Sequence, residues 1–407
     1  MTERMTNVAR LDLENLAQRF GTPFYLFDEG ELLRRISWLR ERLPSKVKLV
    51  YAVKANPFLV PALASAVERF EACSPGEARI CLESGASPSS LVVSGVYKDE
   101  PSTARLMDEA PGTGRFTAES LAQFELIRRL AKERGMRVSV LLRLTSGSQF
   151  GFDGEQVAQV AQQFARDEWV DIAGIQFFSG TQKTSLKRYA RELGRLDDFL
   201  DHLRSTCGFE ARELEYGAGL PVEYFAPQDE QADGELVCEL GRLIQDMRFQ
   251  GDVAIELGRS IAASCGTYVT RIVDAKVNRG QRYAIADGGM HQIVYYGSSM
   301  AMKTPPCHVL RKGDAAEHAD RSELWNVCGS LCTTNDVMVK QAPLGPLDVG
   351  DLLVFERAGA YCMTEGISLF LSRELPRVLA ASATGEVRLL RDAVPTDAFN
   401  SPVPLTS

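Results

Sequence analysis

The sequence predicts an α/β fold, a (β/α)8 TIM-type barrel, followed by a C-terminal β-rich domain that an N-terminal strand completes. Three observations predict it. Eight short apolar runs alternate with longer amphipathic stretches over the first two thirds of the chain. Several of these runs are almost continuously apolar, as strands covered on both faces are. After about residue 265, helical periodicity gives way to short strand-like runs between turn-rich segments.

The barrel strands are expected in eight apolar runs. These are Val47–Lys54, Phe70–Cys73, Leu91–Gly95, Arg115–Ala118, Arg137–Leu144, Ile172–Ser179, Glu213–Gly219 and Val253–Gly258. Amphipathic helices are expected over Glu119–Arg134 and Gly234–Met247, and another over Glu31–Leu43 before the first strand. The strands and helices occupy roughly 230 residues, which is typical of this barrel. An open doubly wound sheet is the alternative, but no GxGxxG follows an early strand.

The β-rich domain is expected to contain further strands after the barrel. These are Thr267–Val277, Arg282–Ala286, Trp325–Cys328 and Leu352–Glu356. Thr22–Phe27 is also strand-like and precedes the barrel, so it could complete this domain. We therefore place the barrel in residues 28–265 and the β domain in residues 1–27 together with 266–407.

Composition excludes several classes of protein. The 407 residues are 45% hydrophobic and 25% charged, as in ordinary globular domains. The net charge of −8 argues against a nucleic-acid-binding surface, which needs a basic stripe. The polar start and the lack of a long apolar stretch predict neither a signal peptide nor a membrane span. Nine cysteines without metal-ligand spacing predict free thiols, no metal site and a cytoplasmic location.

Candidate functional residues gather at the carboxyl ends of the predicted strands, where barrel enzymes build their active sites. Lys54 ends the first strand, and Glu71 and Glu256 belong to the second and eighth. A glycine turn, residues 217–219, ends the seventh, and Arg259 follows the eighth. A lysine at such a position either reaches for water or is held for Schiff-base chemistry. An amine, a phosphate cradle and a carboxylate are what pyridoxal phosphate requires, so we expect this cofactor.

Six motifs in order carry a resemblance to a known family. YAVKAN, the GAG turn, ELGR, DGGM, GSLCTTND and ERAGAY resemble the fold type III pyridoxal-phosphate decarboxylases, the diaminopimelate and ornithine decarboxylase group. The resemblance runs from about Phe20 to about Leu379. It implies a barrel that holds the cofactor, a β domain, and a homodimer whose active sites are shared between subunits.

The resemblance also implies a role for each matching residue. Lys54 would form the Schiff base with the cofactor, Glu256 would pair with the pyridine nitrogen, and Glu71 would lie near the Schiff base. Cys332 would protonate the substrate carbon after CO2 leaves, and Asp336 would contact the substrate, both from the partner subunit. The remaining cofactor-binding residues would be Phe178, Thr181, Gly217, Ala218, Gly219, Gly258, Arg259 and Tyr361.

Three departures from the family pattern concern the substrate. Phe178 replaces a histidine that usually stacks on the cofactor ring, and Thr333 replaces a glutamate that follows the site cysteine. After DGGM the chain reads HQIVYYG, where diaminopimelate decarboxylases have an arginine for the distal carboxylate. A site without these charge partners loses selectivity for free diaminopimelate. GTQ, DGGMH, LCTxxD and RAGAY look closer to the glutamyl–carrier-protein decarboxylase of butirosin biosynthesis.

We therefore expect a decarboxylase acting on the α-carboxylate of an amino acid or an aminoacyl group, free or bound to a carrier protein, in the biosynthesis of a specialised metabolite. A diaminopimelate decarboxylase of lysine biosynthesis is one alternative. A pyridoxal-phosphate amino-acid racemase is another, but it needs two bases, commonly a lysine and a tyrosine. A non-catalytic pyridoxal-phosphate carrier would resemble the barrel alone.

Overall fold

The computed structural model describes residues 11–227, 229–295, 303–312 and 323–403. The chain divides into two compact units. The barrel unit comprises Arg35–Val222 and Asp229–Ile261, and the β unit comprises Met1–Arg34, Glu223–Gln228 and Ala262–Ser407. The first boundary falls within helix α2 (Glu29–Arg42).

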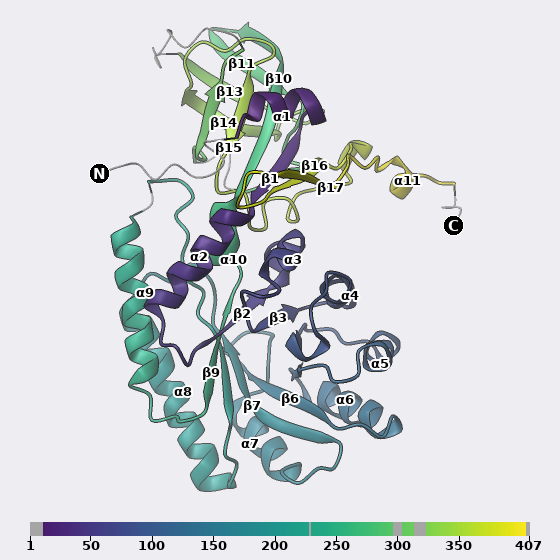
Figure 1. The fold of residues 1–407 in the computed structure, drawn as a ribbon, viewed down its shortest axis with the longest axis vertical. Coiled ribbons are helices and arrows are strands. Elements are labelled where there is room, and N and C mark those ends of the chain that lie inside the picture. The colour runs from purple at the N-terminus through teal and green to yellow at the C-terminus, as the bar shows by residue number, and fades with distance from the viewer. Residues whose placement is uncertain (1–10, 228, 296–302, 313–322, 404–407) are drawn as a thin grey trace. The chain divides into compact units, whose positions relative to one another are not determined.

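Eight parallel strands close into a barrel in sequence order, β2 to β9 (Figure 1). They are β2 (Lys48–Ala52), β3 (Arg69–Ala72), β4 (Leu91–Val93), β5 (Arg115–Ala118), β6 (Val138–Leu144), β7 (Val170–Phe178), β8 (Glu213–Gly217) and β9 (Asp252–Leu257). Every residue of β3 and β8 is buried, which explains why these strands show no alternation of polar and apolar residues. The predicted (β/α)8 barrel is confirmed.

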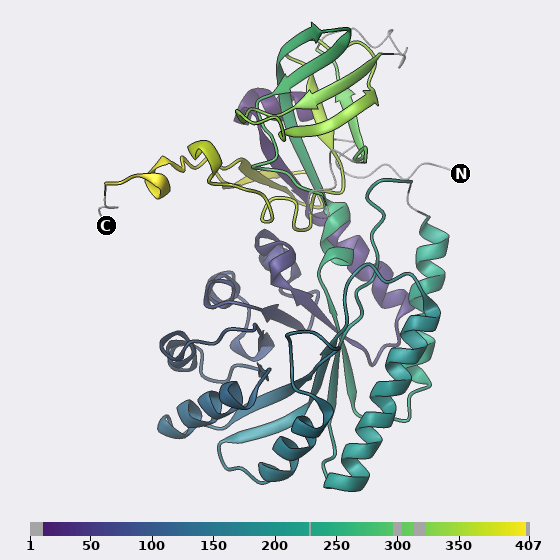
Figure 2. The ribbon, with the colours of Figure 1, turned by 180° about the vertical axis from the view of Figure 1, so that it is seen from behind.

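Helices follow the barrel strands and lie around the outside of the barrel (Figures 1 and 2). They are α3 (Val60–Leu63), α4 (Pro75–Glu83), α5 (Glu100–Glu109), α6 (Leu121–Glu133), α7 (Gly154–Gln163), α8 (Leu186–Cys207) and α9 (Glu230–Gln245). Helix α6 shows why they form. The Ser120 side chain caps its first turn, and Phe124, Ile127 and Leu130 bury one stripe against the barrel unit.

The β unit holds a nine-stranded sheet. Its main path runs β14-β13-β11-β10-β1-β16-β17, and β15 pairs with both β10 and β12. The strands are β1 (Phe24–Asp28), β10 (Gly266–Asn278), β11 (Gln281–Ala286), β12 (Cys307–Leu310), β13 (Leu324–Cys328), β14 (Val337–Pro343), β15 (Leu352–Phe355), β16 (Arg377–Ala381) and β17 (Val387–Arg391). Helices α1 (Leu13–Phe20), α10 (Arg259–Ala262) and α11 (Asp397–Asn400) complete the α-helices of the described residues.

The N-terminal strand β1 is central to this sheet. It pairs antiparallel with β10 and parallel with β16, so it joins two segments that are more than 100 residues apart. All five of its residues are buried. The prediction that an N-terminal strand completes the β-rich part is confirmed.

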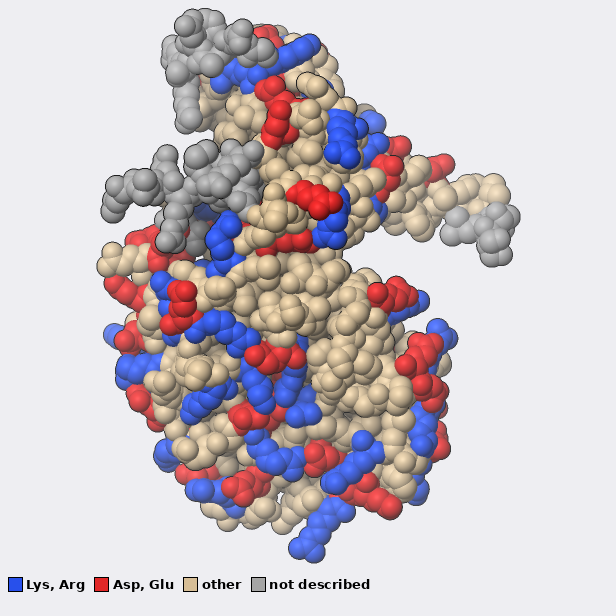
Figure 3. Space-filling model, viewed as in Figure 1, with Lys and Arg blue, Asp and Glu red and all other residues tan. Residues whose placement is uncertain are grey.

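Charged residues of both signs are mixed on the face of the barrel unit that Figure 3 shows. The helices of the barrel unit carry ion pairs, including Arg129 with Glu100 and Glu133, and Arg134 with Asp108. Because positive and negative side chains alternate, this face has no extended region of positive or of negative electrostatic potential.

Candidate active site

Lys54 lies just past the carboxyl end of β2. The strand ends at Ala52, and a single 3-10 turn over Val53–Ala55 carries the lysine. Asn56 follows this turn, and its carbonyl accepts a hydrogen bond of 3.0 Å from the buried Tyr51 hydroxyl. The Lys54 side chain is 40% exposed, so its ammonium lies at the barrel mouth and outside the apolar core.

Two buried carboxyl groups flank the lysine. Glu71 belongs to β3 and Glu256 to β9, the two strands that pair with β2. Lys54 Nζ lies 2.7 Å from Glu71 Oε2 and 3.5 Å from Glu256 Oε1. The structure thus brings together three residues that are far apart in the sequence, as their positions at strand ends predict.

The two carboxyl groups have opposite pKa shifts. Burial raises the pKa of Glu256, and the neighbouring negative charge of Glu71 raises it further. Burial also acts to raise the pKa of Glu71, but the Lys54 ammonium and hydrogen bonds outweigh it and leave that pKa below its ordinary value. Glu71 is therefore the charged partner of Lys54, whereas Glu256 readily takes a proton until a second cation approaches it.

Two further side chains that the sequence reasoning missed complete this cluster. Cys73 Sγ lies 3.5 Å from Lys54 Nζ and 3.3 Å from Glu71 Oε1. Burial, followed by the charge of Glu71, raises the pKa of this thiol, so it stays protonated. Gln176 on β7 donates from Nε2 to Glu256 Oε2 at 3.1 Å. The available signal was a glutamine inside an apolar strand, IAGIQFF.

The glycine turn at residues 217–219 packs directly against the loop that follows β7. Gly219 has a φ of +60°, and a Cβ atom there would lie 2.1 Å from the carbonyl oxygen of Gly180. A Cβ atom at Gly217 would lie 2.4 Å from the Phe178 ring. Glycine is required at position 219 for this close approach of backbone to backbone, and at position 217 for the close approach of the backbone to the Phe178 ring. Thr181, on the same loop, is exposed.

The end of β9 supplies the next predicted group. Gly258 follows the strand, and Arg259 and Ser260 begin the short helix α10. Both side chains are buried, at 9% and 5% exposure. Ser260 Oγ has no hydrogen-bond partner among the residues that the structure describes. A buried hydroxyl in this state is a donor available to a ligand.

The other predicted residues lie in the β unit. Cys332 and Thr333 are in the loop between β13 and β14, where Cys332 is exposed. Tyr361 is half-buried and has a φ of +64°. The contact of Asp336 with substrate stays a prediction, and the structure shows what its carboxylate binds within the chain. Its carboxylate is 2% exposed and accepts backbone N–H bonds of 2.8 Å from Met290 and Leu331, so it holds two loops together.

A comparison with known protein families shows the family to which this chain belongs. The family model of the pyridoxal-dependent decarboxylases, for their pyridoxal-binding domain, matches residues 29–263. The chain belongs to this family. It is a fold type III pyridoxal-phosphate-dependent decarboxylase, a carboxy-lyase, as the motifs predict.

Individual relatives agree with the family. A diaminopimelate decarboxylase of Pseudomonas aeruginosa is 29% identical over 369 residues, which cover 86% of this chain and 85% of that protein. An L-glutamyl-[BtrI acyl-carrier protein] decarboxylase of Niallia circulans is 25% identical over 410 residues, covering 95% and 94%. The crystal structure of a Methanocaldococcus jannaschii diaminopimelate decarboxylase has the same fold, with a TM-score of 0.83 at 23% identity, covering 98% and 96%.

The residues of this decarboxylase fit pyridoxal phosphate. The cofactor needs an amine for its aldehyde, a carboxylate for its ring nitrogen and hydrogen-bond donors for its phosphate. Lys54 is an amine held between two buried carboxyl groups. Glu71 is on β3 and Glu256 is on β9, the neighbouring strands on either side of β2. The glycine turn has no side chain in the way, and the Ser260 hydroxyl lacks a protein partner among the described residues.

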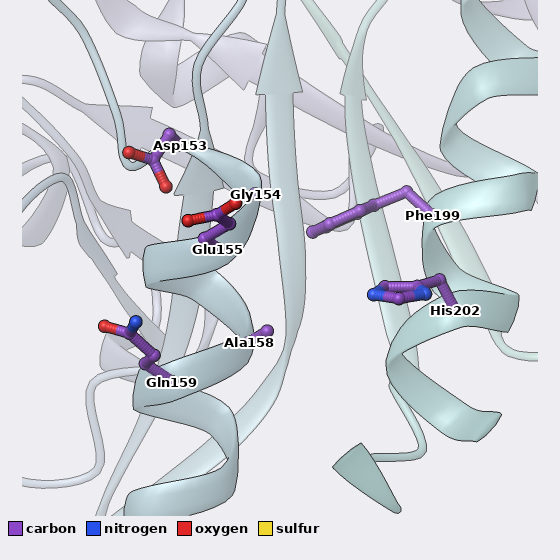
Figure 4. A pocket seen from close by; sticks show the side chains of 7 residues that line it. All are labelled: Asp153, Gly154, Glu155, Ala158, Gln159, Phe199 and His202. Atoms are coloured by element: carbon purple, nitrogen blue, oxygen red, sulfur yellow. The ribbon is translucent and has the colours of Figure 1, made fainter. Parts of the chain in front are cut away.

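A separate cavity of about 670 Å³ lies on the outside of the barrel unit, between α7 and α8 (Figure 4). Asp153, Glu155 and Gln159 line it from α7 and its cap, and Phe199 and His202 line it from α8. It contains none of the predicted site residues. Within the described parts of the chain, no helix is both long and apolar enough to cross a membrane.

Proposed function

We propose that this decarboxylase removes the α-carboxylate of an amino acid or aminoacyl group whose distal end carries no free carboxylate. The observation that carries the proposal is the segment after DGGM. Its one ionisable base is His291, which is buried. Burial, followed by the charge of Arg373, lowers the pKa of His291 to about 4, so the imidazole is neutral at neutral pH. The segment therefore offers no cation to a distal carboxylate.

The substrate we favour is an aminoacyl group carried as a thioester on a carrier protein, in the biosynthesis of a specialised metabolite. A thioester is uncharged, which suits both the neutral His291 segment and the hydroxyl of Thr333. The resemblance to a carrier-protein glutamyl decarboxylase along 95% of this chain supports it. Free diaminopimelate is the second candidate, because several relatives of similar identity are diaminopimelate decarboxylases.

The chain's own groups have distinct tasks in this proposal. Pyridoxal phosphate supplies an aldehyde that captures amines and a ring that accepts the electron pair left when CO2 departs. Lys54 would hold the aldehyde through Nζ. Glu256 keeps a proton at the ring nitrogen, and Gln176 orients its carboxylate. Glu71 stabilises the ammonium of Lys54 through the 2.7 Å ion pair.

The remaining predicted residues bind the cofactor or deliver the final proton. Phe178 offers a ring face without a hydrogen bond or charge. Cys332 delivers a proton from Sγ to the substrate carbon, for which its exposed position is suitable. The phosphate would be held by Gly217, Ala218, Gly219, Thr181, Arg259 and Tyr361. Gly258 would also contact the cofactor.

We also propose a homodimer that shares its active sites. The β unit exposes a group of large apolar side chains in its last third, and apolar side chains of this kind are typical of surfaces that bind another protein. They are Ile367, Leu369, Phe370, Leu371, Leu389, Leu390 and Phe399. A second copy of the chain would cover them and bring its Cys332 loop to the first copy's barrel.

Mixing two inactive variants tests the shared site. Lys54→Ala and Cys332→Ala are each expected to be nearly inactive. If each site takes its lysine from one subunit and its cysteine from the other, half of the randomly exchanged dimers carry one intact site of two. Activity should then recover to about a quarter of the wild-type value. No recovery, after exchange has been verified with differently tagged subunits, would contradict sharing.

A substrate panel tests the proposed function itself. CO2 release is measured from free diaminopimelate, lysine, ornithine and glutamate, and from glutamyl and other aminoacyl thioesters of an acyl-carrier protein. We expect kcat/KM for a carrier thioester to exceed that for any free amino acid by at least about tenfold. A preference for free diaminopimelate would favour the second candidate. Loss of release when the carrier lacks its thiol arm serves as the control.

A further inference from the structure

The barrel unit contains another lysine, Lys183, which is fully buried, in contrast to the half-exposed Lys54. The side chain of Lys183, in the loop after β7, is 0% exposed. Its Nζ lies 2.9 Å from Glu192 Oε2, 3.2 Å from Ser179 Oγ, 3.2 Å from the Tyr216 hydroxyl and 3.3 Å from the Gly217 carbonyl oxygen. Removing an ammonium group from water costs much free energy unless it has an ion-pair partner and hydrogen-bond acceptors. The Lys183 ammonium has both.

Glu192, on α8, connects this lysine to its surroundings. Its carboxylate accepts hydrogen bonds from Lys183, Ser179 Oγ at 2.7 Å, the Tyr216 hydroxyl at 2.8 Å and Arg188 Nε at 2.9 Å. Burial acts to raise the pKa of Glu192, but these donors outweigh it and lower the pKa to about 2. Glu192 is therefore ionised at neutral pH, and its hydrogen bonds tie α8 to both the β7 loop and β8. Burial lowers the pKa of Lys183, and the hydrogen bond and charge of Glu192 oppose that shift.

The β7 loop and the glycine turn are also tied to each other directly. The Lys183 backbone N–H donates to the Gly219 carbonyl at 3.0 Å. The Gln182 side chain donates to the Val222 carbonyl at 2.9 Å and accepts from the Val222 N–H at 2.7 Å. With the close approach of Gly219 to Gly180, these bonds make the two segments a single rigid part.

The bonds from Lys183 orient two peptide groups of the turn. Its ammonium holds the carbonyl of Gly217, and its N–H holds the carbonyl of Gly219. In a trans peptide the C=O and the next N–H point in opposite directions. Fixing these carbonyls toward Lys183 thus turns the N–H groups of Ala218 and Leu220 away from it, where an anion can accept them.

We propose that the buried Lys183–Glu192 pair is the brace that keeps the glycine turn in its anion-binding conformation. Lys183 is a positioning residue: it acts on the cofactor phosphate through the backbone and stays buried behind the turn. This inference rests on the proposed assignment of residues 217–219 to the phosphate. It predicts that Lys183 is needed for recognition of the phosphate and unnecessary for recognition of the aldehyde or the ring.

The experiment compares pyridoxal phosphate with pyridoxal, which lacks the phosphate. Cofactor-free full-length protein is titrated with each aldehyde, and its dissociation constant is read from the visible absorbance of the lysine-bound form. In Lys183→Met the dissociation constant for pyridoxal phosphate should rise by about tenfold or more, and that for pyridoxal by less than about twofold. Glu192→Gln keeps the shape of the brace and removes its charge, so it should show the same selective loss, of smaller size.

Arg69→Met is the matched control, because Arg69 forms another buried ion pair of the barrel unit with Glu213. It should lower the melting temperature and leave the ratio of the two dissociation constants unchanged. An equal loss for both aldehydes in Lys183→Met, or no loss for either, overturns the brace. If Lys183→Met does not fold, Glu192→Gln decides by the same criterion. Wild-type protein that binds both aldehydes equally would instead contradict the phosphate cradle of the proposed function.

Discussion

Lys54→Ala is expected to abolish the visible absorbance of the cofactor-bound protein and to lower kcat for decarboxylation by about 10³-fold or more. The reason is local. The substitution removes the amine that lies 2.7 Å from Glu71 and 3.5 Å from Glu256, and it leaves two buried carboxyl groups facing each other without a cation. Absorbance titration with pyridoxal phosphate and CO2 release measure the two effects.

Lys48→Ala is the matched control for this variant. Lys48 begins the same strand, β2, and pairs with Asp252 at the opposite end of the barrel. Both partners are substantially exposed, so their loss should change stability little. We expect wild-type absorbance and turnover from it. A Lys54→Ala protein that keeps the absorbance band would show that another amine holds the cofactor.

Glu256→Gln is expected to lower kcat by about 10² to 10³-fold while the cofactor still binds. An amide has nearly the shape of the carboxyl group but cannot balance a positive charge at the ring nitrogen. The ring then holds its proton poorly and accepts the electron pair less well. Asp252→Asn, on the first residue of the same strand β9, is the control and should keep wild-type turnover. Unchanged kcat in Glu256→Gln would remove Glu256 from this role.

The same variant has a second consequence in the cofactor-free protein. Burial and then Glu71 raise the pKa of Glu256 in the folded chain, so the folded state keeps a proton that the unfolded chain releases above a pKa of about 4.3. Stability is therefore lost as pH rises from that value toward the folded pKa. Glu256→Gln removes this loss, so the variant should gain stability relative to wild type at neutral pH and not at about pH 4. Thermal unfolding at both pH values measures it, and an equal difference at the two would contradict the shift.

Much of the architecture could be predicted from the pattern of residues. The barrel strands were recognisable because they are buried on both sides, and β5 has the predicted bounds, Arg115–Ala118. The four strands β12, β14, β16 and β17 were missed. Neither β12 nor β17 has a fully buried residue, so these two strands show no core-facing apolar run. Strand β14 is interrupted by Lys340 and Gln341. Strand β16 is buried at four of its five residues, and its short apolar run was overlooked.

The candidate site divides in the same way. The sequence reasoning could find Lys54, Glu71 and Glu256 because each belongs to the end of a buried strand. A charged side chain there costs free energy unless it has a partner or a function. Cys73 and Lys183 could not be found, because their importance comes from partners that are distant in sequence. The substrate contact of Asp336 stays a prediction, and only the structure shows the two backbone hydrogen bonds that its buried carboxylate accepts.

The sequence by itself determined the barrel, the strand that completes the β unit and the amine that a cofactor aldehyde needs. The reason is that the hydropathy of each residue indicates whether it is buried, and its side chain gives its chemistry. Only the tertiary structure decided which carboxyl group shares the lysine's charge and which keeps a proton. It also decided that Lys183 is sealed beneath the glycine turn. Such properties depend on distances of 3 to 4 Å between groups on different strands, and closing the barrel creates them.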